Sequence, residues 1–406
     1  MRLLHIIASM DPASGGPCQG IRNSNPAMMH LGVYREVVCL DDPSAPFIGM
    51  DDFPVHALGP GRGPWHYSAK LKPWLLTNLY RFDVVVINGL WLYSSYAGWS
   101  ALRQLKRDNL KQGGVTRNVP NIFIMPHGML DPYFQRAPDR KLKALRNWFY
   151  WKLIENRVVN DADALLFTCE VELQLAGAAF SPYHPKNKIN VGYGIISPPD
   201  KTPAMLAAFE QKCPGLASQS FYLFLSRIHE KKGVDLLIKA YVALFNKAGE
   251  QGYTIPKLII AGPGVKTAYG RKMLFLASAS PELRKAIIFP GMLTGDAKWG
   301  ALYNCETFIL PSHQENFGIA VVEALACSKP VLISNQVNIW MEIQTGGGGL
   351  VDDDTLEGAT NILQKWRDLP PAKKQKMGED ARQVFLDHFD VANASAIFFK
   401  AISKRY

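Results

Sequence analysis

The sequence predicts an α/β fold made of two doubly wound domains. With 406 residues, of which 48% are hydrophobic and 20% charged, the chain can bury two cores and is too long for one ordinary domain. Short apolar runs alternate with helix-like stretches along its length, and such runs are typical of parallel strands covered on both faces. Each half is therefore expected to hold a parallel sheet between helices.

The apolar runs give the strands in order. The first half contains RLLHIIAS (2–9), DVVVIN (83–88), NIFIMP (121–126) and DALLFT (163–168). The second half contains FYLFLS (221–226), KLIIAG (257–262), AIIFPG (286–291), TFILP (307–311) and PVLIS (330–334). Between the halves, residues 196–215 are rich in proline and lack hydrophobic periodicity, so we predict one domain at 1–200 and a second from 201 onward.

Charge and cysteine usage narrow the class of protein. The formal net charge of +10 favours an anionic partner: nucleic acid, an anionic membrane surface or a phosphorylated ligand. No nucleic-acid-binding module is recognisable, so nucleic acid is not expected. The six cysteines show no C-x-x-C pair and follow no signal peptide, which indicates reduced thiols in a cytoplasmic protein. The uncharged run 84–102 contains glycines and hydroxyl residues and is not expected to span a membrane.

Two loops have the composition of anion sites. DPASGGPCQG (11–20) follows the first strand, and Gly15 and Gly16 would let backbone amides approach a phosphate at the start of a helix, although a plain tight turn explains them equally well. SRIHEKKG (226–233) follows the first strand of the second half. Arg227 and Lys232 could converge there on a diphosphate, the alternative being a solvated run of charges.

The stretch HQENFGIAVVEALACSKPV (313–331) carries two glutamates eight positions apart. If a helix begins near Phe317, the amides of Asn316, Phe317 and Gly318 can face a phosphate or a sugar hydroxyl, with Glu315 projecting from the same loop. Glu323 lies within the apolar VVEALA, where an uncompensated charge is costly to bury. Two vicinal ribose hydroxyls would offset that cost; the alternative is a helix residue that reaches water.

These motifs, in this order, resemble the retaining glycosyltransferases of the GT-B fold, in the group 1 class known as family 4. The resemblance rests on R-x-x-x-x-K-G, IIAGPG (259–264), FPG (289–291), the glutamate pair with its turn, and PHGMLD (126–131). It implies two Rossmann-like domains facing each other across a cleft, the second at 201–388, with a C-terminal helix (389–406) packing back on the first. One departure is Ser226-Arg227-Ile228 where the class has G-R-L, which leaves the charge pair in place.

The resemblance also assigns roles to residues. Glu323 would bind the ribose, Arg227 and Lys232 the diphosphate, and Glu315 the transferred sugar. His127 would contact the sugar from the first domain, although a histidine after a strand is often only structural. The backbone at Leu293 is a weaker candidate for contact with the base.

The function that follows is a retaining, metal-independent hexosyltransferase without a cofactor. The motifs do not distinguish UDP, GDP and ADP. We predict a UDP-hexose such as UDP-glucose as the donor. Electrostatic stabilisation of the departing diphosphate by Arg227 and Lys232 makes a metal unnecessary, and the acidic string 352–354, which has D-x-D spacing, is interpreted as a solvated turn. A nucleotide-sugar epimerase of the same fold and a non-catalytic nucleotide-sugar-binding protein are the alternatives.

The acceptor is expected to be a glycan or a lipid-linked intermediate of surface or exopolysaccharide synthesis. Residues 135–157 hold seven Lys or Arg interleaved with four aromatic residues, and residues 61–81 are similar in character. Such segments can lie on anionic lipid at the inner face of the membrane, the alternative being that the aromatic residues belong to the core.

Overall fold

The chain folds as two α/β units, each with a parallel sheet between helices. The structure is a computed structural model that describes residues 1–111, 118–136, 141–216 and 218–404. One unit comprises residues 1–194 and 391–406, and the other comprises residues 195–390. Both sheets confirm the predicted fold class, and every predicted strand is present.

Unit 1 has a seven-stranded parallel sheet in the order β3-β2-β1-β4-β5-β6-β7. Its strands are β1 (Arg2–Ile6), β2 (Tyr34–Cys39), β3 (Val55–Ala57), β4 (Val84–Asn88), β5 (Asn121–Met125), β6 (Ala164–Phe167) and β7 (Lys188–Asn190). Its helices are α1 (Gly16–His30), α2 (Leu71–Asn78), α3 (Tyr93–Lys111), α4 (Tyr133–Arg136), α5 (Lys141–Tyr150), α6 (Asn156–Asp161), α7 (Glu170–Leu175) and α17 (Val391–Ile402). Short helical turns lie at Pro12–Ser14 and Leu79–Arg81, and a π-helical turn spans Trp151–Glu155.

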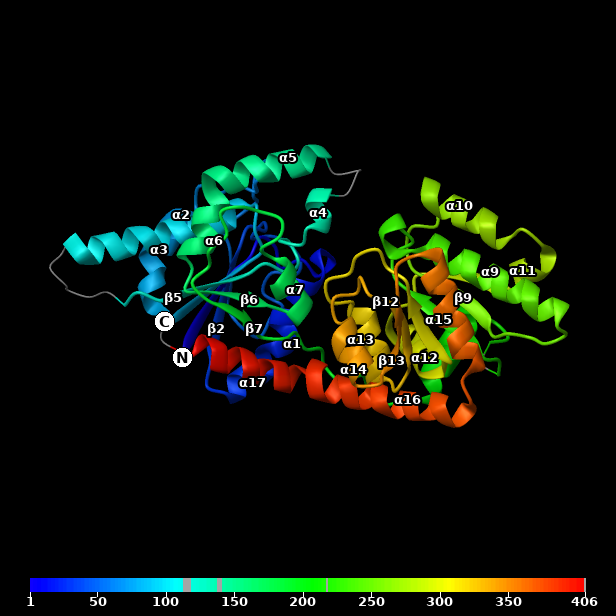
Figure 1. Cartoon of the computed structure of the whole chain (residues 1–406). Helices are drawn as coiled ribbons and strands as arrows, with labels where there is room; N and C mark the ends of the chain where they lie inside the picture. Colours follow the sequence, from blue (N-terminus) through cyan, green and yellow to red (C-terminus); the bar gives the residue numbers. More distant parts are fainter. Residues whose placement is uncertain (112–117, 137–140, 217, 405–406) are drawn as a thin grey trace. The chain divides into compact units, whose positions relative to one another are not determined.

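The two faces of this sheet are covered by different helices (Figure 1). Leu4, Val85 and Ile124 face α2, α3 and α6, whereas Leu3 and Val86 face α1 and α17. Successive residues of one strand point to opposite faces, so both sets are apolar and the strands appear as continuous hydrophobic runs.

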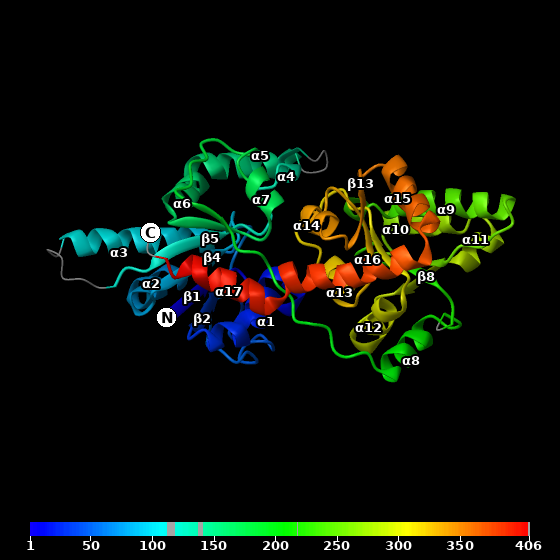
Figure 2. The ribbon, with the colours of Figure 1, turned by 60° about the horizontal axis from the view of Figure 1, so that its bottom comes forward.

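Unit 2 has a six-stranded parallel sheet in the order β10-β9-β8-β11-β12-β13. Its strands are β8 (Phe221–Leu225), β9 (Lys257–Ala261), β10 (Ile287–Gly291), β11 (Thr307–Leu310), β12 (Val331–Ser334) and β13 (Gly349–Asp352). Its helices are α8 (Pro203–Lys212), α9 (Val234–Glu250), α10 (Ala268–Ala277), α11 (Pro281–Ala286), α12 (Gly295–Asn304), α13 (Ile319–Ala326), α14 (Trp340–Thr345), α15 (Leu356–Asp368) and α16 (Pro371–Val384). A 3₁₀ turn spans Glu230–Lys232, and a π-helical turn spans Phe385–Phe389. Figure 2 shows these helices from a second direction.

The sequence between the two sheets contains a helix that was not predicted. Residues 196–215 were expected to be irregular, but α8 begins after Thr202 with Pro203 in its first turn, a position that proline tolerates because its missing N–H would be unpaired there anyway. A Cβ added at Gly300 would lie 2.0 Å from the carbonyl oxygen of Met205, so α12 and α8 pack in close backbone contact. The prolines mark the start of a helix rather than a fully irregular linker.

Candidate functional site

The loops that follow β8, β9 and β10 are joined at the carboxyl edge of the unit 2 sheet. The backbone amide of Ser226 donates to Ala261 (3.1 Å), and that of Ile228 donates to Pro263 (2.8 Å). Gly262 has φ +144°, and a Cβ there would lie 1.9 Å from the carbonyl oxygen of Ser226. Only glycine fits this contact, which accounts for the first glycine of IIAGPG. Arg227 lies between these contacts, exposed, and has no side-chain hydrogen bond or ion pair within the described residues.

Lys232 and Glu315 form an ion pair across two of these loops. Lys232 ends the turn after β8 and is only 6% exposed. Its ammonium group contacts the carboxylate of Glu315, in the loop between β11 and α13. From the sequence, Lys232 was expected to bind the diphosphate and Glu315 the transferred sugar. In the structure the charge of Lys232 is matched by Glu315, and that of Arg227 is not.

Backbone contacts fix the position of this ion pair. The Lys231 carbonyl accepts from the amide of His313 (2.8 Å), and Gly233, at φ +64°, would place a Cβ 1.9 Å from the carbonyl oxygen of Pro311. The amide of Glu315 donates to Gln336 (2.9 Å), and its carbonyl accepts from Asn338 (2.9 Å). Glu315 is therefore held on both sides by a neighbouring loop, and its side chain extends from a rigid support.

Glu323 has a cationic partner that the sequence analysis missed. It lies within α13 as predicted, and its carboxylate is 2.7 Å from the ammonium nitrogen of Lys298 on α12. Both side chains are mostly buried, at 14% and 21% exposure. The ion pair offsets the cost of burying the glutamate without a ligand. Lys298 is 25 positions away in the chain, and no spacing rule connects the two residues.

The first residues of α13 differ slightly from the prediction. The helix begins at Ile319, two residues after the predicted Phe317, and Gly318 is its N-cap with φ +77°. Asn316 and Phe317 therefore belong to the preceding loop. Leu293 is buried in the loop between β10 and α12, at the same edge of the sheet as Arg227.

The acidic string 352–354 is tied to neighbouring side chains. Asp352 pairs with Lys365 (3.2 Å), Asp353 accepts from Asn335 (2.6 Å), and Asp354 lies 2.8 Å from His313. In the described part of the chain, no group of three or more His, Cys, Asp or Glu is arranged to hold a metal ion.

In unit 1, His127 belongs to a buried chain of polar contacts. It follows β5 with φ +52°, an uncommon conformation for a residue other than glycine. Its Nε2 is 3.1 Å from Oδ1 of Asn88, and the Asn88 amide nitrogen is 3.1 Å from Nδ1 of His5. Burial lowers the pKa of His127 to about 4, so the imidazole is neutral near pH 7. His127 is therefore suited to hydrogen bonding rather than to carrying charge.

A buried carboxylate anchors the loop that carries His127. Glu172, on α7, is 3% exposed and accepts from the amide of Gly128 and from the amide (2.8 Å) and hydroxyl (2.6 Å) of Thr168. Neither Glu172 nor Asn88 was a candidate in the sequence analysis. Their partners lie in other loops, so only the fold reveals what they hold.

Gly15 and Gly16 lie where the sequence places them, at the start of α1. Gly15 is the N-cap with φ +91°, and nothing lies within 4 Å of a Cβ added there, so the backbone angle alone requires glycine. The carbonyl of Gly16 accepts from the hydroxyl of Tyr193 (2.6 Å). Both glycines belong to unit 1, whereas Arg227 and Lys232 belong to unit 2.

The two basic aromatic segments differ in structure. In residues 61–81, Leu71, Leu75 and Leu79 are core residues. In residues 135–157, of which 137–140 lie outside the described residues, α5 and the following turn expose large apolar side chains: Leu142, Leu145, Trp148, Phe149 and Leu153. Basic residues on the same segment are Lys141, Lys143, Arg146 and Lys152. A search of the described helices finds none with the length and apolarity to cross a bilayer.

Comparison with known proteins gives two family matches and several relatives. Residues 15–188 match the family described as Glycosyl transferase 4-like domain, and residues 211–384 match Glycosyl transferases group 1. The chain is 27% identical over 168 residues to a D-inositol 3-phosphate glycosyltransferase from Gordonia bronchialis, covering 41% of this chain and 36% of the relative. It is 23% identical over 312 residues to the protein of that name from Stackebrandtia nassauensis, covering 76% and 64%. The alignments thus span less than two thirds of these relatives.

Among solved structures, HepE from Anabaena in complex with UDP is similar in fold. The TM-score is 0.71 at 16% identity, and the alignment covers 99% of this chain and 100% of HepE. HepE has also been solved with UDP-glucose.

Proposed function

Because the chain belongs to the glycosyltransferases of the GT-B fold, with a 4-like domain followed by a group 1 domain, we propose that it transfers a hexose from a nucleoside diphosphate sugar to an acceptor. The observation that carries this proposal is the arrangement at the carboxyl edge of the unit 2 sheet. Arg227, Lys232, Glu315 and Glu323 lie on loops and a helix of one edge, where open α/β sheets bind ligands.

In this proposal, unit 2 binds the donor. Arg227, which is exposed, and Lys232 bind the diphosphate. Glu323 accepts hydrogen bonds from the ribose hydroxyls, and Glu315 accepts hydrogen bonds from the hydroxyls of the transferred sugar. The backbone near Leu293 contacts the base. UDP is the proposed nucleotide, which agrees with the ligands of HepE, a protein of similar fold. When donor binds, ribose hydroxyls would share the Glu323 carboxylate with Lys298, and the diphosphate would share Lys232 with Glu315.

Residues of unit 1 are also proposed to take part. His127 is neutral and its Nε2 is hydrogen-bonded to Asn88, so Nδ1 is the ring atom left to accept from a sugar hydroxyl. Gly15 and Gly16 would let backbone amides at the start of α1 approach the donor phosphates. The reaction is proposed to retain the anomeric configuration, with the departing diphosphate accepting the proton of the attacking hydroxyl.

The proposed chemistry uses protein charges in place of a metal. The diphosphate leaving group carries about two to three negative charges, and Arg227 supplies an unmatched positive charge beside Lys232. Lys232→Ala is expected to lower turnover at least ~100-fold, the scale found when one preorganised charge-stabilising group is removed. Lys239→Ala is the matched control, because Lys239 forms only an exposed pair with Asp235 within α9. Turnover in excess EDTA should equal turnover in buffer, and loss of activity that Mg²⁺ or Mn²⁺ restores would contradict the metal-independent mechanism.

The test of the function is a donor screen. UDP, GDP and ADP and their hexose derivatives are added to the full chain, and thermal unfolding is followed, since a ligand that binds only the folded state raises the midpoint. UDP and UDP-glucose are expected to raise it most. Slow release of UDP from UDP-glucose, accelerated by a glycan or lipid-linked acceptor, supports transfer. Conversion of the donor to an epimer without an acceptor would indicate an epimerase, and the absence of a response to every nucleotide would refute the donor site.

The acceptor is proposed to be a glycan or a lipid-linked intermediate of polysaccharide synthesis, reached at the inner face of a membrane. The support is the exposed apolar and basic surface of α5. Apolar side chains flanked by lysine and arginine are suited to lie at an anionic lipid surface.

A further inference from the structure

Unit 1 contains a small, partly open cavity next to the polar chain of His127 and Asn88, and both of these residues are among those that line it. It has a volume of about 70 Å³ and is lined by residues of the sheet, of α1 and of α17, all of which belong to unit 1. Its polar lining includes His5 of β1, Arg35 of β2, Ser24 of α1 and Ser395 of α17. None of the described residues that line it is an aspartate or a glutamate.

Three buried polar atoms of the residues that line it have no hydrogen-bond partner among the described residues. They are Nε2 of His5, Nε of Arg35 and Oγ of Ser395. The three residues are 4%, 4% and 2% exposed, so bulk water does not reach them. Buried polar groups are nearly always hydrogen-bonded, and three orphans around one cavity indicate a missing partner.

The contacts of Asn88 show that His5 presents a hydrogen to the cavity. The Asn88 side-chain nitrogen lies 3.2 Å from the carbonyl oxygen of Val86, so it is the donating amide group, and it also lies 3.1 Å from Nδ1 of His5. Nδ1 therefore accepts, and the proton of the neutral ring is on Nε2. Burial lowers the pKa of His5 well below its usual value, which keeps the ring neutral. All three orphan groups can thus donate.

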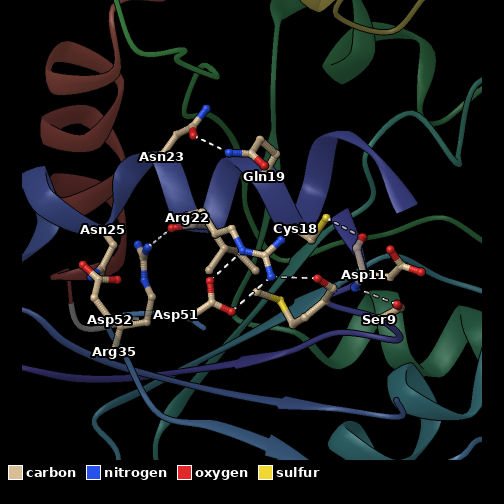
Figure 3. A network of polar contacts seen from close by, with 12 residues as sticks. Ser9, Asp11, Cys18, Gln19, Arg22, Asn23, Asn25, Arg35, Asp51 and Asp52 are labelled. Atoms are coloured by element: carbon tan, nitrogen blue, oxygen red, sulfur yellow. Dashed lines mark hydrogen bonds and ion pairs between the residues drawn. The ribbon is translucent and has the colours of Figure 1, made fainter. Parts of the chain in front are cut away.

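The cavity also has a positive charge without a matching carboxylate. Two arginines near α1 differ in this respect. The Arg22 guanidinium is bonded to Asp51 at 2.6 and 3.1 Å (Figure 3). Arg35 donates instead to the hydroxyl of Ser24 (3.1 Å) and to the carbonyl of Ile21. Across the described residues, Arg35 forms no ion pair, and exposed Asp52 acts on it only at longer range. Burial lowers the pKa of Arg35 to about 10, so it is still charged at pH 7.

We propose that this cavity binds a small inorganic anion, a halide or an oxyanion such as phosphate, held by Arg35, His5 and Ser395. One water molecule could accept two of the three hydrogen bonds, but it would leave the buried charge of Arg35 unmatched, which is the larger cost. Because Ser395 belongs to α17 and the other two residues belong to the sheet, the anion would also join the C-terminal helix to strands β1 and β2. The inference does not rest on sugar transfer, although Asn88 and His127 also line this cavity.

The first test is anion-dependent stability of the full chain. Thermal unfolding is measured at constant ionic strength while sodium gluconate, which has a bulkier anion, is replaced by sodium chloride or sodium phosphate. At ten times the dissociation constant, the midpoint for unfolding of wild-type unit 1 should rise by roughly 3–6 °C. Ser395→Ala should lessen the rise and Arg35→Met should abolish it, whereas Ser403→Ala, at an exposed serine just after α17, should leave it unchanged.

The second test locates the ion directly. Crystals of the full chain grown in sodium bromide should give an anomalous peak within hydrogen-bond distance of Nε of Arg35, and crystals of the Ser395→Ala variant should give a weaker one. Equal salt responses in all variants would show a general salt effect and refute the site. Density for water alone, with no anomalous signal at this position, would also refute the site. This crystallographic test needs only wild-type protein.

Discussion

At the scale of single residues, Glu315 and Glu323 are distinguished by their cations. Glu315 contacts Lys232, and Glu323 contacts Lys298. Glu315→Ala removes a negative charge beside the proposed diphosphate, so UDP affinity should be unchanged or higher while turnover falls about 100-fold. Glu323→Ala removes the proposed ribose acceptor, so UDP affinity should fall about tenfold, as expected for loss of a hydrogen bond to a charged group. Calorimetry with UDP and steady-state rates separate the two effects.

The control for both variants is Glu357→Ala, at an exposed position of α15. It should change neither UDP affinity nor turnover. An equal loss of UDP affinity in Glu315→Ala and Glu323→Ala would contradict the division of roles.

Also at the residue scale, Glu155 should make stability depend on pH. It is fully buried, its Oε2 accepts a long hydrogen bond from Ser95 (3.3 Å), and burial raises its pKa from 4.5 to about 8. Because the folded protein holds the Glu155 proton more tightly than the unfolded chain does, the free energy of unfolding is highest below pH 4.5. It falls as pH rises from about 4.5 to 8, where the unfolded chain ionises more readily. Glu155→Gln cannot ionise. Its free energy of unfolding, relative to that of wild type, should therefore increase by about 1–3 kcal/mol between pH 5 and pH 8.

Urea unfolding at pH 5 and pH 8 measures this difference. Asp108→Asn, on the exposed side of α3, serves as control and should follow wild type at both pH values. Parallel pH dependence of wild type and Glu155→Gln would show that Glu155 is ionised in the folded protein.

At the scale of elements, the exposed side of α5 should determine lipid binding. Leu142 is 86% exposed and Phe149 is 54% exposed, within a helix that also carries lysines and an arginine. Replacing both residues with glutamate removes apolar area and adds repulsion from anionic lipid, so binding to vesicles with 30% phosphatidylglycerol (roughly the charge density of an anionic leaflet) should fall at least about tenfold. Phe275→Glu, at a 78% exposed position on α10, is the control and should bind as wild type in co-sedimentation.

At the scale of elements, the sequence predicted the long buried strands and missed the short or polar ones. The long buried strands were predicted because both faces of the sheet are covered, which makes each strand a continuous apolar run. Strands β2, β3, β7 and β13 were missed. β3 and β7 have three residues each and no apolar run, β2 carries Arg35 and Glu36 in its first half, and β13 follows three glycines. Pairing with a neighbouring strand stabilises these segments, and pairing is not visible in local sequence.

The candidate site shows the same limit. Glu315, Arg227 and Lys232 stand out because they follow apolar strands, at the edge where open α/β sheets bind ligands, and glycines such as Gly233 allow the close loop contacts of that edge. Lys298 and Glu172 look like ordinary surface residues of a helix until the fold shows which groups they contact.

At the scale of the whole molecule, hydrogen exchange can show which unit binds which part of the donor. Each unit has its own sheet and core, so a ligand bound to one unit should protect the loops of that unit first. UDP, which lacks the sugar, should slow exchange in the loops 226–233 and 311–318 of unit 2, and, through its phosphates, at the amides beside Gly15 and Gly16. UDP-glucose should in addition slow exchange in residues 126–131 of unit 1, because His127 is proposed to contact the sugar. Mass spectrometry of peptides from the full chain measures both effects, with α10 as an internal reference that neither ligand should change. If UDP protected unit 1 alone, the nucleotide would bind to unit 1 rather than to unit 2, and the assignment of the donor site would be overturned.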